Sequence, residues 1–317
     1  MTAFRPVACA GAPRDLGLDQ GASAREAVRA AVARLPRAVR LAAALGADAR
    51  IARAARDALC HYPHASERLA GLARGAGVAR AALGALLARE LAAGGAPPAA
   101  SGEALAVAPG EGPGLVARSL SPVPEAGAFP WLLRRSAPEH DWRSVELALP
   151  WLVPALAGVN ERGLAVVGVV RPAAPGSLDA CAAPALLLVQ ECLQRCDGVA
   201  KAIEWCERRP SGGCASFLLA DAGGEVAEVA LEGARRRVAR PRDGLLAVAA
   251  PERAAELGKA CAARAPLDEE AVAEALAAPP APGAPPRATV LLDPAARTLA
   301  LRTPDGRWTR FAVDSAF

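Results

Sequence analysis

Apolar runs of strand length come in neighbouring pairs over the last two thirds of the chain, and this pattern constrains the fold more than any other feature. The first pair covers residues 103–108 and 115–120, and the short glycine-rich connection between them predicts antiparallel strands. Further runs of this kind lie at residues 145–149, 152–156, 164–170, 215–220, 225–231, 235–239, 245–249, 288–292, 298–302 and 308–313. Two pairs of amphipathic helices fall between these strands, at residues 184–196 and 199–208 and at residues 251–263 and 267–277. This order predicts an α+β fold with two stacked sheets covered by helices.

The first third of the chain has helical periodicity instead. Apolar residues recur at helical spacing over residues 24–61, with a break at Pro36, and two shorter helices follow. A glycine- and proline-rich stretch at residues 94–102 then ends all periodicity. We therefore expect an N-terminal helical segment at residues 1–100 and a sandwich domain at residues 101–317.

Composition and charge limit the classes of partner that the protein can bind. Only Lys201 and Lys259 are lysine among the 37 basic residues, a bias that reflects GC-rich coding and says little about a ligand. The net charge is +4 and only 3% of the residues are aromatic, whereas a nucleic-acid surface gathers basic residues on one face with aromatic residues between them. No apolar run approaches the roughly 20 residues that cross a bilayer, and the first 14 residues lack the pattern of a secretion signal. We expect a cytoplasmic protein that binds neither nucleic acid nor membrane.

The eight cysteines form no Cys-x-x-Cys pair, and most of them fall within apolar patterns. In a reducing compartment such residues are usually small buried hydrophobic groups. Cys60, His61 and His64 are close in sequence, but nothing near them completes a tetrahedral set of ligands. We expect neither a metal site nor a cofactor.

Asn160 is the chain's one asparagine, and it lies between two apolar runs of strand type. Its amide both donates and accepts hydrogen bonds and its backbone tolerates tight turns, so it serves either a hairpin or a polar pocket. The hairpin is the favoured interpretation, because asparagine and glycine occur in most β-turns. We expect an Asx-type hydrogen bond within residues 159–163, whose loss costs on the order of 1 kcal/mol.

Four glycine-containing motifs follow one another along the chain. They are residues 11–21 (GAPRDLGLDQG), 69–78 (LAGLARGAGV), 160–164 (NERGL) and 219–224 (LADAGG). Their order and spacing resemble those of isopenicillin N acyltransferase-like proteins (acyl-CoA:6-aminopenicillanic acid acyltransferases), relatives of choloylglycine hydrolases among the N-terminal nucleophile hydrolases. The resemblance covers nearly the full length of the chain.

The resemblance implies a four-layer αββα sandwich and a self-cleaving chain. Such proteins cut their own backbone ahead of a cysteine, which becomes the nucleophile, while its new α-amino group acts as the general base. An α-amine titrates near neutral pH, so it can take the thiol proton while nearby donors hold the oxyanion.

At the positions that the resemblance assigns to chemistry, the chain departs from the family. The nucleophile falls in residues 101–107, where the matching residue is Gly102 and no cysteine is present. The Arg-Asn-x-Asp sequence of the next strand corresponds to residues 118–121, which keep only Arg118. Ser121 stands where the family has the aspartate that holds the new amine.

Two further positions carry the oxyanion donors in the family. Asn160 matches one of them, whereas a second asparagine corresponds to about Ser216. The resemblance therefore implies that Arg118 and Asn160 are retained, and that the nucleophile, the amine holder and the second amide are lost.

Two residues are candidates for a replacement nucleophile. Ser101 is the better one, but a serine hydroxyl needs a positioned base, and no histidine or lysine is adjacent. Glu103 is a candidate base, although a solvated linker carboxylate is the favoured interpretation. Cys214 lies in a Gly-Cys-x-Ser sequence, yet it follows the asparagine turn that the family nucleophile precedes, so we expect a buried free thiol there.

Losing three functional positions together favours a catalytically degenerate homologue, kept as a binding or scaffold protein that persists as one uncut chain. The alternative is an active amidohydrolase or acyltransferase that uses Ser101 or a displaced thiol on a small amide or acyl-thioester. The candidate site residues are Ser101, Arg118 and Asn160 for chemistry and Ser121 and Ser216 for binding. A homo-oligomer and an accessory subunit that supplies the missing groups are both left open.

Overall fold

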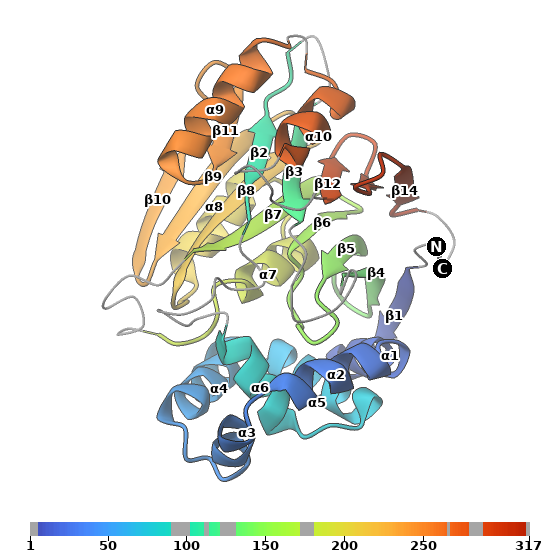
Figure 1. Ribbon diagram of the computed structural model, residues 1–317, viewed down its shortest axis with the longest axis vertical. Helices are drawn as coiled ribbons and strands as arrows, with labels where there is room; N and C mark the ends of the chain where they lie inside the picture. Colours follow the sequence, from blue (N-terminus) through green and yellow to red (C-terminus); the bar gives the residue numbers. More distant parts are fainter. Residues whose placement is uncertain are drawn as a thin grey trace.

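The protein contains two β-sheets with helices outside them (Figure 1). The computed structural model describes residues 6–89, 102–110, 114–120, 131–171, 181–264, 267–278 and 288–314. The strands are β1 (Val7–Gly11), β2 (Ala104–Val107), β3 (Leu115–Leu120), β4 (Leu132–Pro138), β5 (Ser144–Ala148), β6 (Ala157–Asn160), β7 (Leu164–Arg171), β8 (Cys214–Asp221), β9 (Val226–Glu232), β10 (Arg235–Ala239), β11 (Leu245–Val248), β12 (Ala288–Asp293), β13 (Thr298–Arg302) and β14 (Trp308–Ala312). The helices are α1 (Pro13–Ser23), α2 (Arg25–Arg34), α3 (Arg37–Ala44), α4 (Ala49–His61), α5 (Pro63–Ala76), α6 (Arg80–Arg89), α7 (Leu187–Arg195), α8 (Val199–Arg208), α9 (Pro251–Ala262) and α10 (Glu269–Ala277).

The layers follow the order that the sequence predicts. Sheet A has the strand order β1-β4-β5-β6-β7-β8-β9-β10, and sheet B has the order β11-β2-β3-β12-β13-β14. The two sheets pack face to face, with α7 and α8 on the outer side of sheet A and α9 and α10 on the outer side of sheet B. The prediction of a four-layer αββα sandwich is therefore confirmed. Helices α1 to α6 form a further group beside sheet A and α7 (Figure 1).

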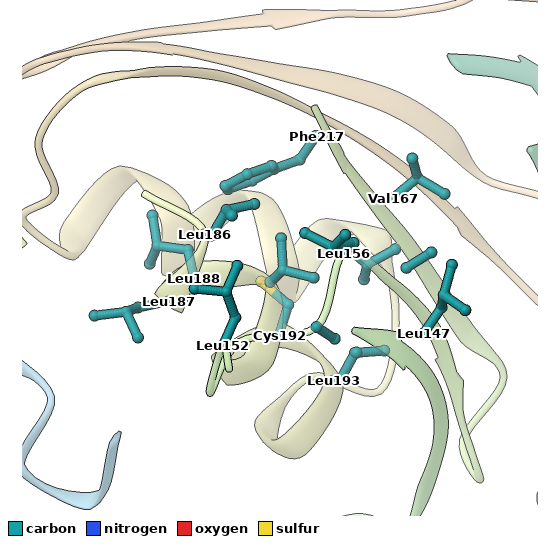
Figure 2. Packing of buried hydrophobic residues seen from close by; sticks show 14 of the residues in the cluster. Leu147, Leu152, Leu156, Val167, Leu186, Leu187, Leu188, Cys192, Leu193 and Phe217 are labelled. Atoms are coloured by element: carbon teal, nitrogen blue, oxygen red, sulfur yellow. The ribbon is translucent and has the colours of Figure 1, made fainter. Parts of the chain in front are cut away.

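Helix α7 lies directly against sheet A, and Leu193 is among the side chains between them (Figure 2), whereas Leu187 points away from the sheet. Two strand glycines permit this approach. A Cβ atom at Gly158 would lie 2.8 Å from Leu193 Cδ1, and one at Gly168 would lie 2.8 Å from Val189 Cγ2. Side chains at these positions would push the helix away from the sheet.

Helices α1 and α5 pack backbone against backbone through four glycines. Cβ atoms at Gly17 and Gly71 would each lie 1.9 Å from a carbonyl oxygen of the opposite helix. Those at Gly21 and Gly75, one turn further on, would each lie 2.3 Å from such an oxygen. No real Cβ atom fits at these distances, so the contact requires glycine on both helices.

The N-terminal third differs from its expected helical form in one respect. Strand β1 pairs in parallel with β4 and so adds this part of the chain to sheet A. The sequence pattern predicts no strand there, and the first helix that it predicts begins only after α1. The expected boundary falls among residues 90–101, which lie outside the described residues, so the division at residue 101 stays a prediction.

The strand expected at residues 152–156 is wrong. This stretch is irregular, and β6 begins only at Ala157. Its first residues bond to side chains instead: Leu152 O accepts from Gln20 Nε2 at 2.9 Å, and Val153 O accepts from Arg134 Nη2 at 2.7 Å. Only Leu156, next to β6, bonds within this stretch to the backbone of β5 and β7. Pro154 has no amide hydrogen to give to a neighbouring strand, so the apolar run is buried without being a strand.

Replacing a contact glycine should be costly. We expect Gly71→Ala to lower the free energy of unfolding by about 2 kcal/mol or more, because the helices must separate to admit the methyl group. The matched control is Gly258→Ala in α9, where no atom lies within 4 Å of the added Cβ. There the gain in helix propensity should stabilise the protein by about 0.5–1 kcal/mol. Urea unfolding of both variants measures the contrast, and equal effects would contradict the proposed role of the glycine contact.

Candidate functional site

Gly102 precedes β2, at the position that the resemblance assigns to the nucleophile. Its φ is +156°, and a Cβ atom there would lie 3.1 Å from Arg118 Nη2 and 3.1 Å from Ser119 O. Arg118 is fully buried, is in register with Ala104 of β2, and donates from Nη1 to Gly168 O at 2.5 Å. The structure thus brings Arg118 beside the position that the resemblance assigns to the nucleophile, and the residue at that position has no side chain.

Ser101 and Ser121 lie outside the described residues, so their catalytic and binding roles stay predictions. The expectation for Glu103 as a solvated carboxylate is wrong. Its side chain is buried, and its Oε2 accepts from Arg253 Nε at 3.2 Å, because α9 packs over this end of sheet B. This ion pair gives Glu103 a structural role, and its role as a base for Ser101 stays a prediction.

Arg118 and Ser216 both face the layer between the two sheets. Val116 of β3 packs in the core between the sheets, and side chains alternate along a strand, so Arg118 shares its face. A Cβ atom at Gly168 would point toward α7 and would lie 3.6 Å from Phe217 Cδ1, so Phe217 of β8 also faces α7. Ser216, next to it and 1% exposed, therefore faces sheet B.

Asn160 faces the other way. Gly158, two residues before it on β6, lies against Leu193 of α7, and Asn160 shares that face. Its Nδ2 donates to Leu193 O at 2.9 Å and to Cys196 O at 2.8 Å, and its Oδ1 accepts from Arg162 N at 3.0 Å and from Leu164 N at 2.9 Å. The predicted Asx-type bond is confirmed, and the same side chain also holds the C-terminal end of α7. Both amide hydrogens are used, so neither is left to bind an oxyanion.

The buried cysteines fit their expected role. Cys214 is buried, and so are all the others except Cys60. His64, one of the three residues considered for a metal, instead contacts the carboxylate of Glu191. In the described ranges no group of three histidine, cysteine or acidic side chains could hold a metal ion. No helix in those ranges is long and apolar enough to cross a membrane.

The outer face of sheet A carries a buried polar network that sequence reasoning missed. Arg134 of β4 contacts Glu146 of β5 through Nε, and donates to Gln20 Oε1 at 2.7 Å and to Gln190 Oε1 at 2.6 Å. Glu146 Oε1 accepts from Ser144 Oγ at 2.6 Å and from Gln190 Nε2 at 2.8 Å. The network therefore joins β4 and β5 to α1 and α7.

The charges of this network set the ionisation of Glu146. Burial opposes its ionised form, but the positive charges of Arg134 and Arg68 and the hydrogen bonds from its neighbours outweigh burial and hold its pKa at about 2. A signal was present in the sequence, because β4 and β5 carry polar residues at alternate positions. The sequence alone could not show that this polar face is covered by α1 and α7.

Comparison with known proteins finds no protein-family model and no curated sequence that matches this chain. Among solved structures, penicillin V acylase from Agrobacterium tumefaciens has a TM-score of 0.49 at 13% identity, over 66% of this chain and 86% of that one. The N-acylethanolamine-hydrolyzing acid amidase ortholog of Caenorhabditis elegans has a TM-score of 0.48 at 10% identity, over 61% and 93%. A mutant of conjugated bile acid hydrolase from Clostridium perfringens has a TM-score of 0.44 at 10% identity, over 67% and 92%. The fold assignment rests on the layers described above.

Substitutions of Asn160 should act on folding. Asn160→Ala leaves two buried carbonyl oxygens and two backbone amides without partners, so we expect the free energy of unfolding to fall by about 3 kcal/mol, more than a single local bond would cost. Asn160→Asp keeps the two acceptor bonds of the turn but loses both donor bonds to α7, and it should also destabilise the fold. Thermal and urea unfolding test this order. An Asn160→Ala protein of unchanged stability would contradict it.

Proposed function

We propose that this chain is a catalytically degenerate relative of the isopenicillin N acyltransferase-like N-terminal nucleophile hydrolases, retained as a binding or scaffold protein. The observation that carries the proposal is Gly102 beside Arg118. The buried Arg118 lies beside the start of β2, which supports the resemblance, but Gly102 has no side chain that could attack a carbonyl group.

The surroundings of Gly102 support the same conclusion. A φ of +156° is unfavourable for any residue with a Cβ atom, and the two contacts of 3.1 Å leave little space for one. The backbone here is therefore suited to glycine and not to a cysteine. Asn160 adds to this argument, because its amide is committed to four backbone partners.

Self-cleavage needs several groups at once. A side-chain nucleophile attacks the preceding carbonyl carbon, the peptide nitrogen leaves with a proton, and water opens the resulting ester or thioester. An oxyanion hole must hold the negative charge while this happens, and losing one donor alone costs about 10²- to 10³-fold in rate. With Gly102 at the nucleophile position and Asn160 engaged elsewhere, two of these groups are missing. Localisation in the cytoplasm and a homo-oligomeric state remain expectations.

The chain should persist uncut. We expect intact-mass spectrometry of freshly purified protein to show one species near 32.2 kDa, the mass of the full chain. The paired control is Ser101→Ala, which should give the same result with the mass of its own sequence. Two fragments with a new N-terminus at Ser101, absent from the Ser101→Ala protein, would establish a serine nucleophile and overturn the proposal. A screen of both proteins against acylated amines and acyl-thioesters should likewise show no difference between them.

Restoring a thiol should not restore activity. Gly102→Cys supplies a nucleophile, but its Cβ atom is strained and crowds Arg118, and no donor replaces Asn160 at the oxyanion. We expect no hydrolysis above background and a loss of stability of about 1 kcal/mol or more. Gly102→Ala is the control that carries the same strain without the thiol, and it should be destabilised to a similar extent. Hydrolysis of an amide by the cysteine variant alone would show that the remaining machinery is intact.

A further inference from the structure

A polar cavity of about 330 Å³ lies on the outer side of sheet A, away from the layer that contains Gly102. Its walls come from the first turns of α1 and α5, from the end of β4 and from α7. Such a volume suits a small molecule. The exposed residues Glu139 and His140 form part of the lining, so the cavity is reachable from solvent.

Arg68 of α5 lines this cavity and lacks the acceptors that a buried guanidinium needs. The residue is 2% exposed, yet its Nε and Nη1 have no hydrogen-bond partner among the described residues. Its one hydrogen bond is a long one, from Nη2 to Ser136 Oγ at 3.4 Å. Buried charges in proteins are ordinarily paired with an opposite charge or bound to a ligand.

The neighbouring groups do not neutralise Arg68. Glu146 is the one carboxylate in this cluster; Arg134 contacts it directly, and Arg68 interacts with the same single negative charge. Cys9 supplies no charge, because burial raises the pKa of its thiol. Burial and the charge of Arg134 lower the pKa of Arg68 to about 10, which still leaves it protonated at neutral pH. The cluster therefore holds one positive charge in excess.

The acidic residue of α7 near the cavity, Glu191, already contacts other basic side chains. Glu191 contacts His64 and lies 3.6 Å from Arg195 Nε and 3.8 Å from Arg209 Nη2. Asp141, at the edge of the cavity, lies 3.9 Å from Arg195 Nη1. No carboxylate of the described residues is within 4.0 Å of the Arg68 guanidinium.

A second buried group in the same cavity also lacks a partner. Gln194 is 5% exposed, and its Oε1 accepts no hydrogen bond from the part of the chain that the structure describes. A ligand that satisfies both groups needs an anionic group for Arg68 and a donor hydrogen for Gln194. The first turns of α1 and α5 add positive potential, since the amino ends of helices favour anions.

We propose that this cavity binds a small organic monocarboxylate that also carries a hydroxyl group. Its carboxylate pairs with Arg68, and its hydroxyl group donates to Gln194 Oε1. A monoanion fits because Arg68, Arg134 and Glu146 leave one positive charge in excess. Of the acidic residues at the cavity, Asp141 is paired with Arg195, whereas Glu139 repels a second negative charge such as that of inorganic phosphate. The site is independent of Ser101, so it holds whether or not the proposed loss of catalysis is correct.

The direct test is calorimetric titration of the full chain with three probes: lactate, acetate and inorganic phosphate. We expect lactate to bind most tightly, acetate more weakly and phosphate least. Arg68→Met should weaken lactate binding about 10- to 100-fold, the loss that corresponds to one charge-assisted hydrogen bond. Arg74→Met, an exposed arginine of the same helix, is the matched control and should bind lactate as the unaltered protein does.

Thermal unfolding without ligand separates a binding role from a structural one. Arg68→Met removes an uncompensated buried charge and keeps an apolar side chain of similar length, so we expect its melting temperature to be unchanged or higher. Gln194→Met should reduce lactate binding to the level of acetate and leave acetate binding unchanged, and it provides a second variant should Arg68→Met fold poorly. Absence of binding by all three probes, or tighter binding of phosphate than of lactate, would overturn the proposal.

Discussion

The backbone contact between α1 and α5 positions two buried polar residues on the outer side of sheet A, Gln20 and Arg68. With glycine on both helices, the two backbones approach until two carbonyl oxygens of each helix lie against glycines of the other. Gln20 of α1 then reaches Pro150 O and Leu152 O at 3.1 and 2.9 Å, and accepts from Arg134. Arg68 of α5 is carried to the cavity by the same contact. A side chain at any of the four glycines would move both residues together.

The motifs that carry the family resemblance have structural roles in this chain. Asn160 fixes its own turn and the end of α7. Asp221 accepts from Val199 N at 2.9 Å at the start of α8 and from Gly223 N at 3.0 Å in its own turn. Gly163 joins these two turns, since a Cβ atom there would lie 2.7 Å from Ala222 Cβ. These motifs are therefore accounted for by the scaffold of this chain, and the scaffold does not depend on a nucleophile at residue 102.

The spacing of apolar residues predicted most of the sandwich, because its strands and outer helices each bury one regular face. Helix α8 and strands β3 and β10 begin and end at the expected residues. Helix α1 escaped prediction because its buried face includes two glycines and the amide of Gln20 in place of an apolar stripe. The site was less predictable, because only local hydrogen bonds can be inferred from sequence. The Asx bond of Asn160 is local, whereas its two bonds to α7 join residues 33 and 36 positions apart and follow from the packing of the helix on the sheet. An arginine on a helix is normally solvated, so only the depth of α5 in the structure reveals that Arg68 is buried.

The charge on Arg68 also links the cavity to sheet A. Glu146 is held ionised by both Arg134 and Arg68, and it ties β5 to α7 through Gln190. A ligand carboxylate bound to Arg68 would pair with that arginine and weaken the effect of Arg68 on the ionisation of Glu146. The site would then hold two arginines and two carboxylates, with no net charge. Replacing Arg68 by methionine leaves one arginine opposite one carboxylate, which is also neutral. Of these three states, which are the ligand-bound protein, the Arg68→Met protein and the unaltered protein without ligand, only the last has an uncompensated buried charge. This is why a ligand that supplies the missing charge should stabilise the unaltered protein, while a variant without the arginine gains nothing from it.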